Sequence, residues 1–243
     1  MTGQLIGLGV GPGDPELMTL KAIRVLKTAD VLAHFAKAGR PSHARTSAQQ
    51  FLPAHYIEAP LLYPVTTEHP ADSPQYRASI DAFFDEAAAL LSQHLDAGRI
   101  VVVLSEGDPL FFGSYMHLHV RLQSRYPVQV IPGVTAMSAA WSAAGTAMVH
   151  GDRTLTVLPG TMPETELRER LESTDSAVIM KIGRNLAKIR RALAACGRLE
   201  EAIYIEWASM GRQQVARLAE KRDDHAPYFA MVLLPDLWDP HEV

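Results

Sequence analysis

Cysteine is almost absent from this chain, since Cys196 is the only one among 243 residues. A single thiol cannot form an internal disulfide, and it cannot build a metal site that needs several cysteines. Positive charge is also scarce: 23 lysines and arginines are outnumbered by 27 acidic residues, which leaves a formal net charge of -4. General binding to nucleic acid or to an anionic membrane needs a basic surplus, so the sequence disfavours both kinds of partner.

Long apolar runs are missing too. No stretch approaches the roughly 18 consecutive apolar residues of a membrane-spanning helix. The first residues, MTGQLIGLGVGPGDP, lack the basic start and the long apolar segment of a secretory signal. We therefore expect a cytoplasmic protein with no membrane partner. Its composition, 47% hydrophobic and 21% charged, is that of an ordinary folded globular protein.

Short apolar runs alternate with helical patterns along the chain. In the first half we predict strands at residues 5–10, 31–33, 100–104 and 128–131, and helices at 17–28 and 75–97. In the second half we predict helices at 134–144, 164–172 and 184–195, and strands at 155–158, 177–180, 202–205, 214–218 and 228–234. The expected fold class is α/β, with two α/β domains at residues 1–131 and 132–243. The second domain is expected to be more antiparallel than the first.

The stretch 36–74 shows no clear period. It contains six prolines, and four histidines lie between residues 34 and 69. Because proline interrupts both helices and strands, we expect one short helix and loops here, forming a flap near the active site. The histidines are too scattered to predict a metal site. His117 and His119 would lie on different faces of a helix, so no metal is expected.

Three glycine- and proline-rich segments each follow a predicted strand: GLGVGPGDP at 7–15, SEGDPLFFG at 105–113 and IPGVTA at 131–136. Glycine-rich turns let the main chain approach a ligand, and parallel α/β sheets bind ligands at the carboxyl ends of their strands. The segments therefore predict one shared crevice. The alternatives are a tight turn without a ligand and, for Thr135, a helix N-cap. The dinucleotide fingerprint G-x-G-x-x-G is broken by Pro12 or Asp14, which disfavours a dehydrogenase.

The three segments resemble the signatures of the tetrapyrrole (corrin/porphyrin) methyltransferase family, as GVGPGDPELMTLKA, LSEGDPLFFG and IPGVTAMSAA. With AVIMKIGRNL at 177–186, the resemblance runs from Leu5 to about Leu234. Within the family the chain is similar to the branch that methylates precorrin-2 at C-20, giving precorrin-3A in cobalamin (vitamin B12) biosynthesis. The alternatives are methylation of cobalt-factor II or another precorrin, and a regulatory module that binds S-adenosylmethionine or a nucleotide without catalysis.

The resemblance implies a class III methyltransferase fold. S-adenosylmethionine would bind in a cleft between the two domains, S-adenosylhomocysteine would be the product, and the protein would be a homodimer. The implied cofactor contacts are Pro12, Glu106, Gly107, Asp108, Phe111, Thr135, Ala136, Met180, Lys181, Ala208 and Tyr228. Many members have a glycine in place of Glu106, so this side chain would face the substrate instead. Glu106 or a histidine could be the base that removes a proton from the methylated carbon, and Glu106 is our catalytic candidate.

A tetrapyrrole carries several carboxylates, so its pocket needs cations. Our candidates are Arg40, Arg45, Lys181 and Arg184, because arginine can bind a carboxylate through two parallel hydrogen bonds. A solvated surface charge is the alternative for each. The main catalytic task would be alignment of the reacting atoms, which can supply up to roughly 7–11 kcal/mol.

Overall fold

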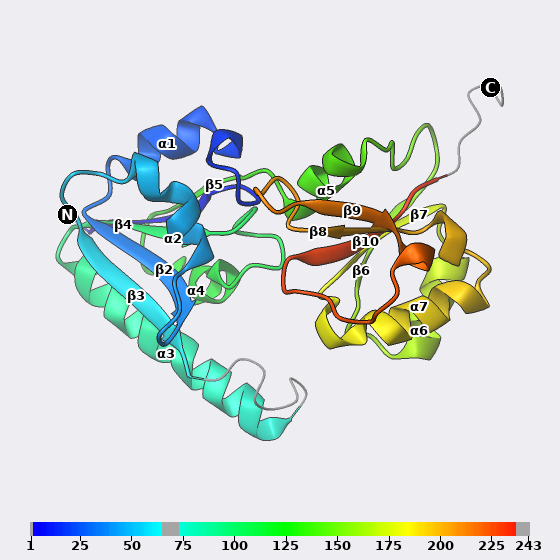
Figure 1. Ribbon diagram of the computed structural model, residues 1–243. Helices are drawn as coiled ribbons and strands as arrows, with labels where there is room; N and C mark the ends of the chain where they lie inside the picture. The colour runs from blue at the N-terminus through cyan, green and yellow to red at the C-terminus, as the bar shows by residue number, and fades with distance from the viewer. Residues whose placement is uncertain (1, 65–72, 237–243) are drawn as a thin grey trace. The chain divides into compact units, whose positions relative to one another are not determined.

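The computed structural model describes residues 2–64 and 73–236, which form two compact units (Figure 1). The first unit is Met1–Thr135 and the second is Ala136–Val243. This division falls a few residues beyond the predicted boundary between 131 and 132. The physical reason is that the loop after Ile131 packs on the first unit, where Gly133 lies against Gly9 and Gly107.

The first unit is built on a five-stranded sheet in the order β3-β2-β4-β1-β5. All of its strand pairs are parallel. The strands are β1 (Gln4–Gly9), β2 (Val31–Lys37), β3 (Ile57–Tyr63), β4 (Ile100–Ser105) and β5 (Val128–Ile131). Because parallel strands run in one direction, all five carboxyl ends lie at the same edge of the sheet.

Helices cover both faces of this sheet, and alternate residues of each strand point to opposite faces. On one face, α1 (Leu20–Leu26) and α2 (His43–Ala48) pack against Leu8, Leu32 and Leu104. On the other, α3 (Pro74–Asp96) and α4 (Tyr115–Leu122) pack against Leu5, Ala33 and Val103. Central strands are therefore apolar on both faces, as the IVVVL run predicted.

The second unit has a mixed five-stranded sheet in the order β6-β7-β10-β8-β9. Only β6 and β7 are parallel neighbours; the pairs β10–β7, β10–β8 and β8–β9 are antiparallel, as the sequence predicted. The strands are β6 (Leu155–Pro159), β7 (Ser176–Met180), β8 (Ile203–Glu206), β9 (Gln214–Arg217) and β10 (Ala230–Leu234).

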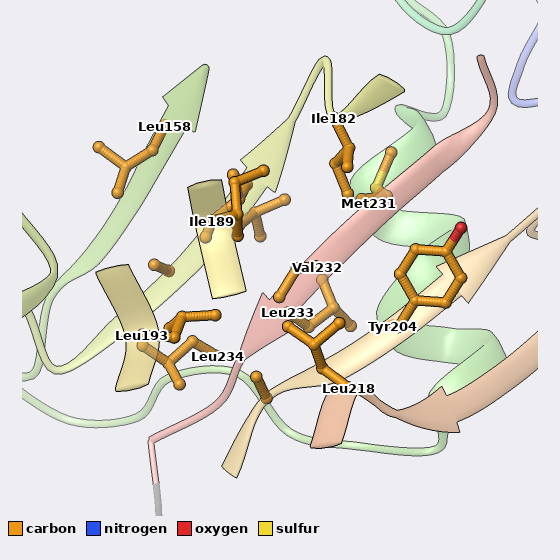
Figure 2. Close-up of a cluster of buried hydrophobic side chains, with 14 of the residues drawn as sticks. Leu158, Ile182, Ile189, Leu193, Tyr204, Leu218, Met231, Val232, Leu233 and Leu234 are labelled. Atoms are coloured by element: carbon orange, nitrogen blue, oxygen red, sulfur yellow. The ribbon is translucent and has the colours of Figure 1, made fainter. Parts of the chain in front are cut away.

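Three helices complete the second unit: α5 (Ala136–Ala144), α6 (Glu164–Glu172) and α7 (Leu186–Ala195). Figure 1 shows α5 on one side of the sheet and α6 and α7 on the other. Figure 2 shows the core, where Val232 and Leu233 of β10 lie among side chains such as Ile189 and Leu193 of α7. Every residue of β10 is buried, which identifies it as the central strand of this core.

Short 3-10 turns join several of these elements: η1 (Pro15–Leu17), η2 (Gln49–Phe51), η3 (Gly183–Asn185), η4 (Leu199–Glu201) and η5 (Leu218–Glu220). The helix predicted at 17–28 is shorter than expected. It begins at Leu20 because Thr19 caps it, its side chain accepting a hydrogen bond from the N–H of Ala22. The last predicted strand begins at Ala230 rather than Tyr228.

The prediction of one short helix and loops for 36–74 was wrong in part. The short helix exists as α2, but β2 extends to Lys37, and Ile57–Tyr63 forms the unpredicted strand β3. Proline is tolerated at Pro60 because β3 is an edge strand, where one side of the backbone needs no ladder partner. Residues 65–72 of the predicted flap lie outside the described residues. The helix α4 was also not predicted.

Candidate functional site

The three glycine-rich segments come together at the carboxyl edge of the first sheet. The N–H of Gly107 donates to the carbonyl oxygen of Gly11 at 2.8 Å, which forms an isolated bridge between the first two segments. The third segment lies against both. A Cβ built at Gly133 would be 2.0 Å from the oxygen of Gly107 and 3.0 Å from the Cα of Gly9. The segments therefore touch backbone to backbone, as the sequence predicted.

Two Asp-Pro pairs shape the first two segments in the same way. Asp14 accepts a hydrogen bond from the N–H of Glu16, and Asp108 accepts one from the N–H of Leu110, each at 2.9 Å. Such side-chain turns fix the backbone locally, and the proline that follows each aspartate pre-sets its own φ. The second carboxylate oxygen of Asp108 also accepts the N–H of Gly133 at 3.2 Å. Asp108 thus joins the second segment to the third.

Gly7 has a packing role in this arrangement. A Cβ at Gly7 would lie 2.4 Å from the ring of Tyr115, the buried first residue of α4. The Tyr115 ring therefore occupies the space that any side chain at Gly7 would need. The alternation of strand residues puts Gly7 on the α4 face, so this glycine supports the helix below the segments.

Comparison with known proteins places this arrangement in a family. The model of the family described as Tetrapyrrole (Corrin/Porphyrin) Methylases matches residues 4–221. The chain belongs to this family. Its two-sheet architecture is the one that tetrapyrrole methyltransferases have.

Three relatives show how far the similarity extends. The chain is 58% identical over 233 residues to a precorrin-2 C(20)-methyltransferase of a Sinorhizobium species, covering 96% of this chain and 95% of the relative. It is 31% identical to the cobalt-precorrin-2 C(20)-methyltransferase of Salmonella typhimurium, covering 98% and 99%. A solved uroporphyrin-III C-methyl transferase from Thermus thermophilus, complexed with S-adenyl homocysteine, is 26% identical with a TM-score of 0.66, covering 95% and 97%.

Glu106 directly follows β4, so it stands at the edge where the segments meet. The side chain is partly buried. Burial raises the pKa of Glu106 to about 7, and the nearby backbone of Ala44 in α2 only partly offsets this. The Tyr63 side chain at the end of β3 lies within electrostatic range of Glu106. A carboxyl group that titrates near neutrality is suited to accept a proton in catalysis.

The other first-unit residues predicted to contact the cofactor lie in or beside the same segments. Pro12 and Gly107 are buried, and Asp108 is partly buried. The ring of Phe111 packs edge-on against the ring of Phe112, with centroids 4.9 Å apart. The φ of Phe112 is 52°, a left-handed value that is rare outside glycine and that is often found at functional sites. Thr135 and Ala136 stand where the first unit ends and α5 begins.

The second-unit candidates gather at one edge of the second sheet. Met180 ends β7, and Ala208 follows shortly after β8. Because β10 runs antiparallel to both strands, its beginning lies at this same edge. Tyr228, 79% exposed, precedes β10, and the N–H of Trp207 donates to the oxygen of the next residue, Phe229, at 2.8 Å. Left-handed φ values of 55° at Lys181 and 53° at Trp207 mark this edge as strained.

The four cations predicted to bind substrate have different surroundings. Arg40 follows β2 and is exposed, and Lys181 and Arg184 are exposed just after β7. Arg45 is instead engaged within the protein. Its Nε donates to Glu58 through a short contact, and its Nη2 donates to the hydroxyl of Tyr56 at 3.3 Å.

Sequence reasoning missed two polar contacts beside the site. The hydroxyl of Tyr63 makes a short hydrogen bond with the hydroxyl of Ser114, just before α4. The buried His34 contacts Glu58 through Nε2 at 3.2 Å. Both contacts involve β3. Its burial pattern alternates only from Glu58 to Leu62, and the proline within that stretch obscures the signal.

Within residues 2–64 and 73–236, no three histidine, cysteine or acidic side chains are grouped so that they could hold a metal ion. In that part of the chain, no helix combines the length and the apolar character needed to cross a bilayer.

Proposed function

We propose that this chain transfers a methyl group from S-adenosylmethionine to C-20 of precorrin-2, giving precorrin-3A in cobalamin biosynthesis. The observation that carries the proposal is the 58% identity to a precorrin-2 C(20)-methyltransferase along 96% of the chain. The match extends over nearly the whole chain, so it includes both compact units.

The packing of the glycine-rich segments supports the proposal that S-adenosylmethionine binds there. Gly9, Gly107 and Gly133 approach so closely that no side chain fits between them, so the surface they form is made of main chain. This suits a ligand held largely through backbone groups. When bound, S-adenosylmethionine supplies a methyl group already activated on a sulfonium, and S-adenosylhomocysteine remains. We propose as contacts Pro12, Gly107, Asp108, Phe111, Thr135 and Ala136, with Met180, Lys181, Ala208 and Tyr228 of the second unit.

The protein's own contribution is to align the reactants and to remove a proton. A reduced tetrapyrrole bridge carbon has enamine character, so it is nucleophilic and needs little chemical activation. After the new carbon–carbon bond forms, the hydrogen on C-20 leaves as a proton, and its bonding pair restores the double bond. We assign Glu106 as the acceptor. Its pKa of about 7 keeps much of it ionised at neutral pH while letting it hold the proton briefly.

Arg40, Lys181 and Arg184 are proposed to bind substrate carboxylates. Arg45 is also proposed to bind a substrate carboxylate, but its guanidinium would remain bonded to Glu58 at the same time. Arg184→Ala should raise the KM for precorrin-2 several-fold and leave the Kd for S-adenosylhomocysteine unchanged. Arg170→Ala, at another exposed arginine of the second unit, is the matched control. If Arg184→Ala and the control have the same KM, the role of Arg184 is refuted.

Cobalt-factor II is the second candidate substrate, because a relative that is 31% identical is named for another cobalt-containing tetrapyrrole, cobalt-precorrin-2. Purified protein is incubated anaerobically with labelled S-adenosylmethionine and either substrate, and initial rates of methyl transfer are compared. We expect precorrin-2 to gain one methyl group, and to react faster. Calorimetry should show binding of S-adenosylhomocysteine and none of NAD. Binding without transfer to either substrate would support the regulatory alternative.

We propose further that the protein is a cytoplasmic homodimer with no nucleic-acid or membrane partner and no resident metal. The edge strand β9 supports self-association, since all four of its residues are exposed and an open edge strand can pair with a second copy. Sedimentation equilibrium should give twice the chain mass of 26.6 kDa. A single-chain mass at micromolar concentration would contradict the dimer.

A further inference from the structure

The loop at 207–213 joins β8 to β9 and carries an arginine that the sequence analysis did not single out. Strands β7 and β8 both run antiparallel to β10, so their carboxyl ends lie at one edge of the second sheet. The loop begins at that edge, beside the proposed cofactor contact Ala208. Trp207 and Ser209 have left-handed φ values of 53° and 64°, which are rare outside glycine. The loop therefore has a defined and unusual backbone shape.

Hydrogen bonds hold the loop and its tryptophan in place. The N–H of Met210 donates to the oxygen of Trp207, and the N–H of Gln213 donates to the oxygen of Met210, both at 2.9 Å. The side-chain oxygen of Gln213 accepts the N–H of Ser209 at 2.8 Å. The N–H of Trp207 donates to the oxygen of Phe229, and the centroids of these two rings are 5.0 Å apart. The Trp207 ring is thus fixed from both the backbone and a neighbouring ring.

The guanidinium of Arg212 lies over this ring, with its Cζ 3.3 Å from the ring centroid. At that distance a guanidinium standing on edge would push a nitrogen into the ring, so the two planes must be roughly parallel. Arginine stacks on aromatic faces in this way, and its N–H groups then point outward within the plane. Arg212 is exposed. One face of its guanidinium is therefore covered by Trp207, while the donating edge stays accessible.

Arg212 has no protein acceptor for these donors. Among the residues that the structure describes, its guanidinium takes part in no ion pair or hydrogen bond. The nearest carboxylate along the chain, Glu206, accepts a hydrogen bond from the hydroxyl of Tyr204 at 2.5 Å. By contrast, the exposed Arg191 of the same unit is paired with Glu164 at 2.7 Å. Stacking orients Arg212, and nothing in the described chain neutralises it.

We propose that Arg212 binds a carboxylate of the tetrapyrrole substrate, with Trp207 as the positioning residue that holds its guanidinium. The inference rests on the proposed function. Lys181 and Arg184 are also exposed at this edge of the sheet, just after β7. S-adenosylmethionine has one carboxylate, whose charge its own ammonium balances, whereas a tetrapyrrole carries several. Three exposed cations at one edge therefore match the substrate better than the cofactor.

Arg212→Met tests the contact, because it removes the donors and keeps an unbranched apolar stem over Trp207. We expect the Kd and the KM for precorrin-2 to rise roughly tenfold, the lower end for a hydrogen bond to a charged group, since the site is exposed. The kcat and the Kd for S-adenosylhomocysteine should stay unchanged. Arg212→Lys should recover only part of the affinity, because lysine keeps the charge without the planar fork.

Arg222→Met is the matched control. Arg222 is also exposed, and it follows η5 beyond the other end of β9, where the N–H of Leu218 bonds to Ala202 at the start of β8. This variant should leave both values for precorrin-2 as in the wild type. Equal values in Arg212→Met and the control would overturn the substrate contact. A weaker Kd for S-adenosylhomocysteine in Arg212→Met alone would also overturn it, since the bound carboxylate would then be the cofactor's.

A double-variant cycle tests the role of Trp207. Trp207→Leu should raise the Kd for precorrin-2 about two- to fivefold, the size of an exposed cation–π contact, and Trp207→Phe should restore most of the affinity. Added to Arg212→Met, Trp207→Leu should have no further effect. An undiminished effect in that background would refute the positioning role. The Kd is measured by anaerobic absorbance titration, without turnover. A wild type that binds precorrin-2 but transfers no methyl group would therefore refute the proposed function, and the Kd values would still decide the Arg212 contact.

Discussion

Replacing Glu106 with glutamine should stabilise the protein in alkaline solution. Burial raises the pKa of Glu106 from 4.5 to about 7, so the native state holds this proton more tightly than the unfolded chain does. The wild type therefore loses stability as pH rises from about 4.5 to 7, and the loss is complete above that window. At 1.36 kcal/mol per pKa unit, the penalty is about 3 kcal/mol. Glutamine keeps the shape and removes the charge.

Thermal denaturation at pH 5, 7 and 9 measures the effect. Glu106→Gln should gain little at pH 5 and most at pH 9, where about 3 kcal/mol corresponds to roughly 6–12 °C in Tm for a chain of this length. Glu58→Gln is the control of opposite sign. The lowered pKa of Glu58 contributes stability above about pH 4.5 that this variant loses. The reasoning is refuted if Glu106→Gln does not raise the Tm, or if it raises the Tm equally at pH 5 and pH 9.

Two further substitutions test the packing of the glycine-rich segments. Gly133→Ala places a methyl group 2.0 Å from the backbone oxygen of Gly107, which no rotamer change can move. We expect the free energy of unfolding to fall by about 3 kcal/mol. Calorimetry should show S-adenosylhomocysteine binding at least about tenfold more weakly. Gly211 has open space around it, so Gly211→Ala should change neither the stability nor the affinity for S-adenosylhomocysteine. Equal affinities in Gly133→Ala and Gly211→Ala would contradict the close-packed site. Asp108→Ala leaves two N–H groups without their acceptor and should cost about 2 kcal/mol in urea denaturation; a change below about 0.5 kcal/mol, the range of ordinary surface substitutions, would count against it.

Much of the fold follows from local pattern. The run IVVVL at 100–104 predicts a strand apolar on both faces, and it lies between β2 and β1 in the parallel sheet. Once the strands are parallel, their carboxyl ends must share an edge. The contact between Gly107 and Gly133 is therefore a consequence of topology as much as of the motifs. This is why the meeting of the three segments could be predicted.

The details around Glu106 could not be predicted, because they join residues far apart in the chain. The missed strand β3 supplies Glu58 and Tyr63, whose partners are Arg45, His34 and Ser114. Periodicity gives no information on such pairs. Arg45 was predicted to bind substrate from its charge alone. Only the structure shows that the carboxylate of Glu58 already contacts it.

The position of the transferred methyl group tests the central claim most directly. Precorrin-2 and carbon-13 methyl-labelled S-adenosylmethionine are incubated anaerobically with the purified protein, and the product is examined by carbon NMR and mass spectrometry. We predict a single label, on C-20. A label on any other carbon, or no transfer to precorrin-2 by protein that binds S-adenosylhomocysteine, would contradict the proposed function.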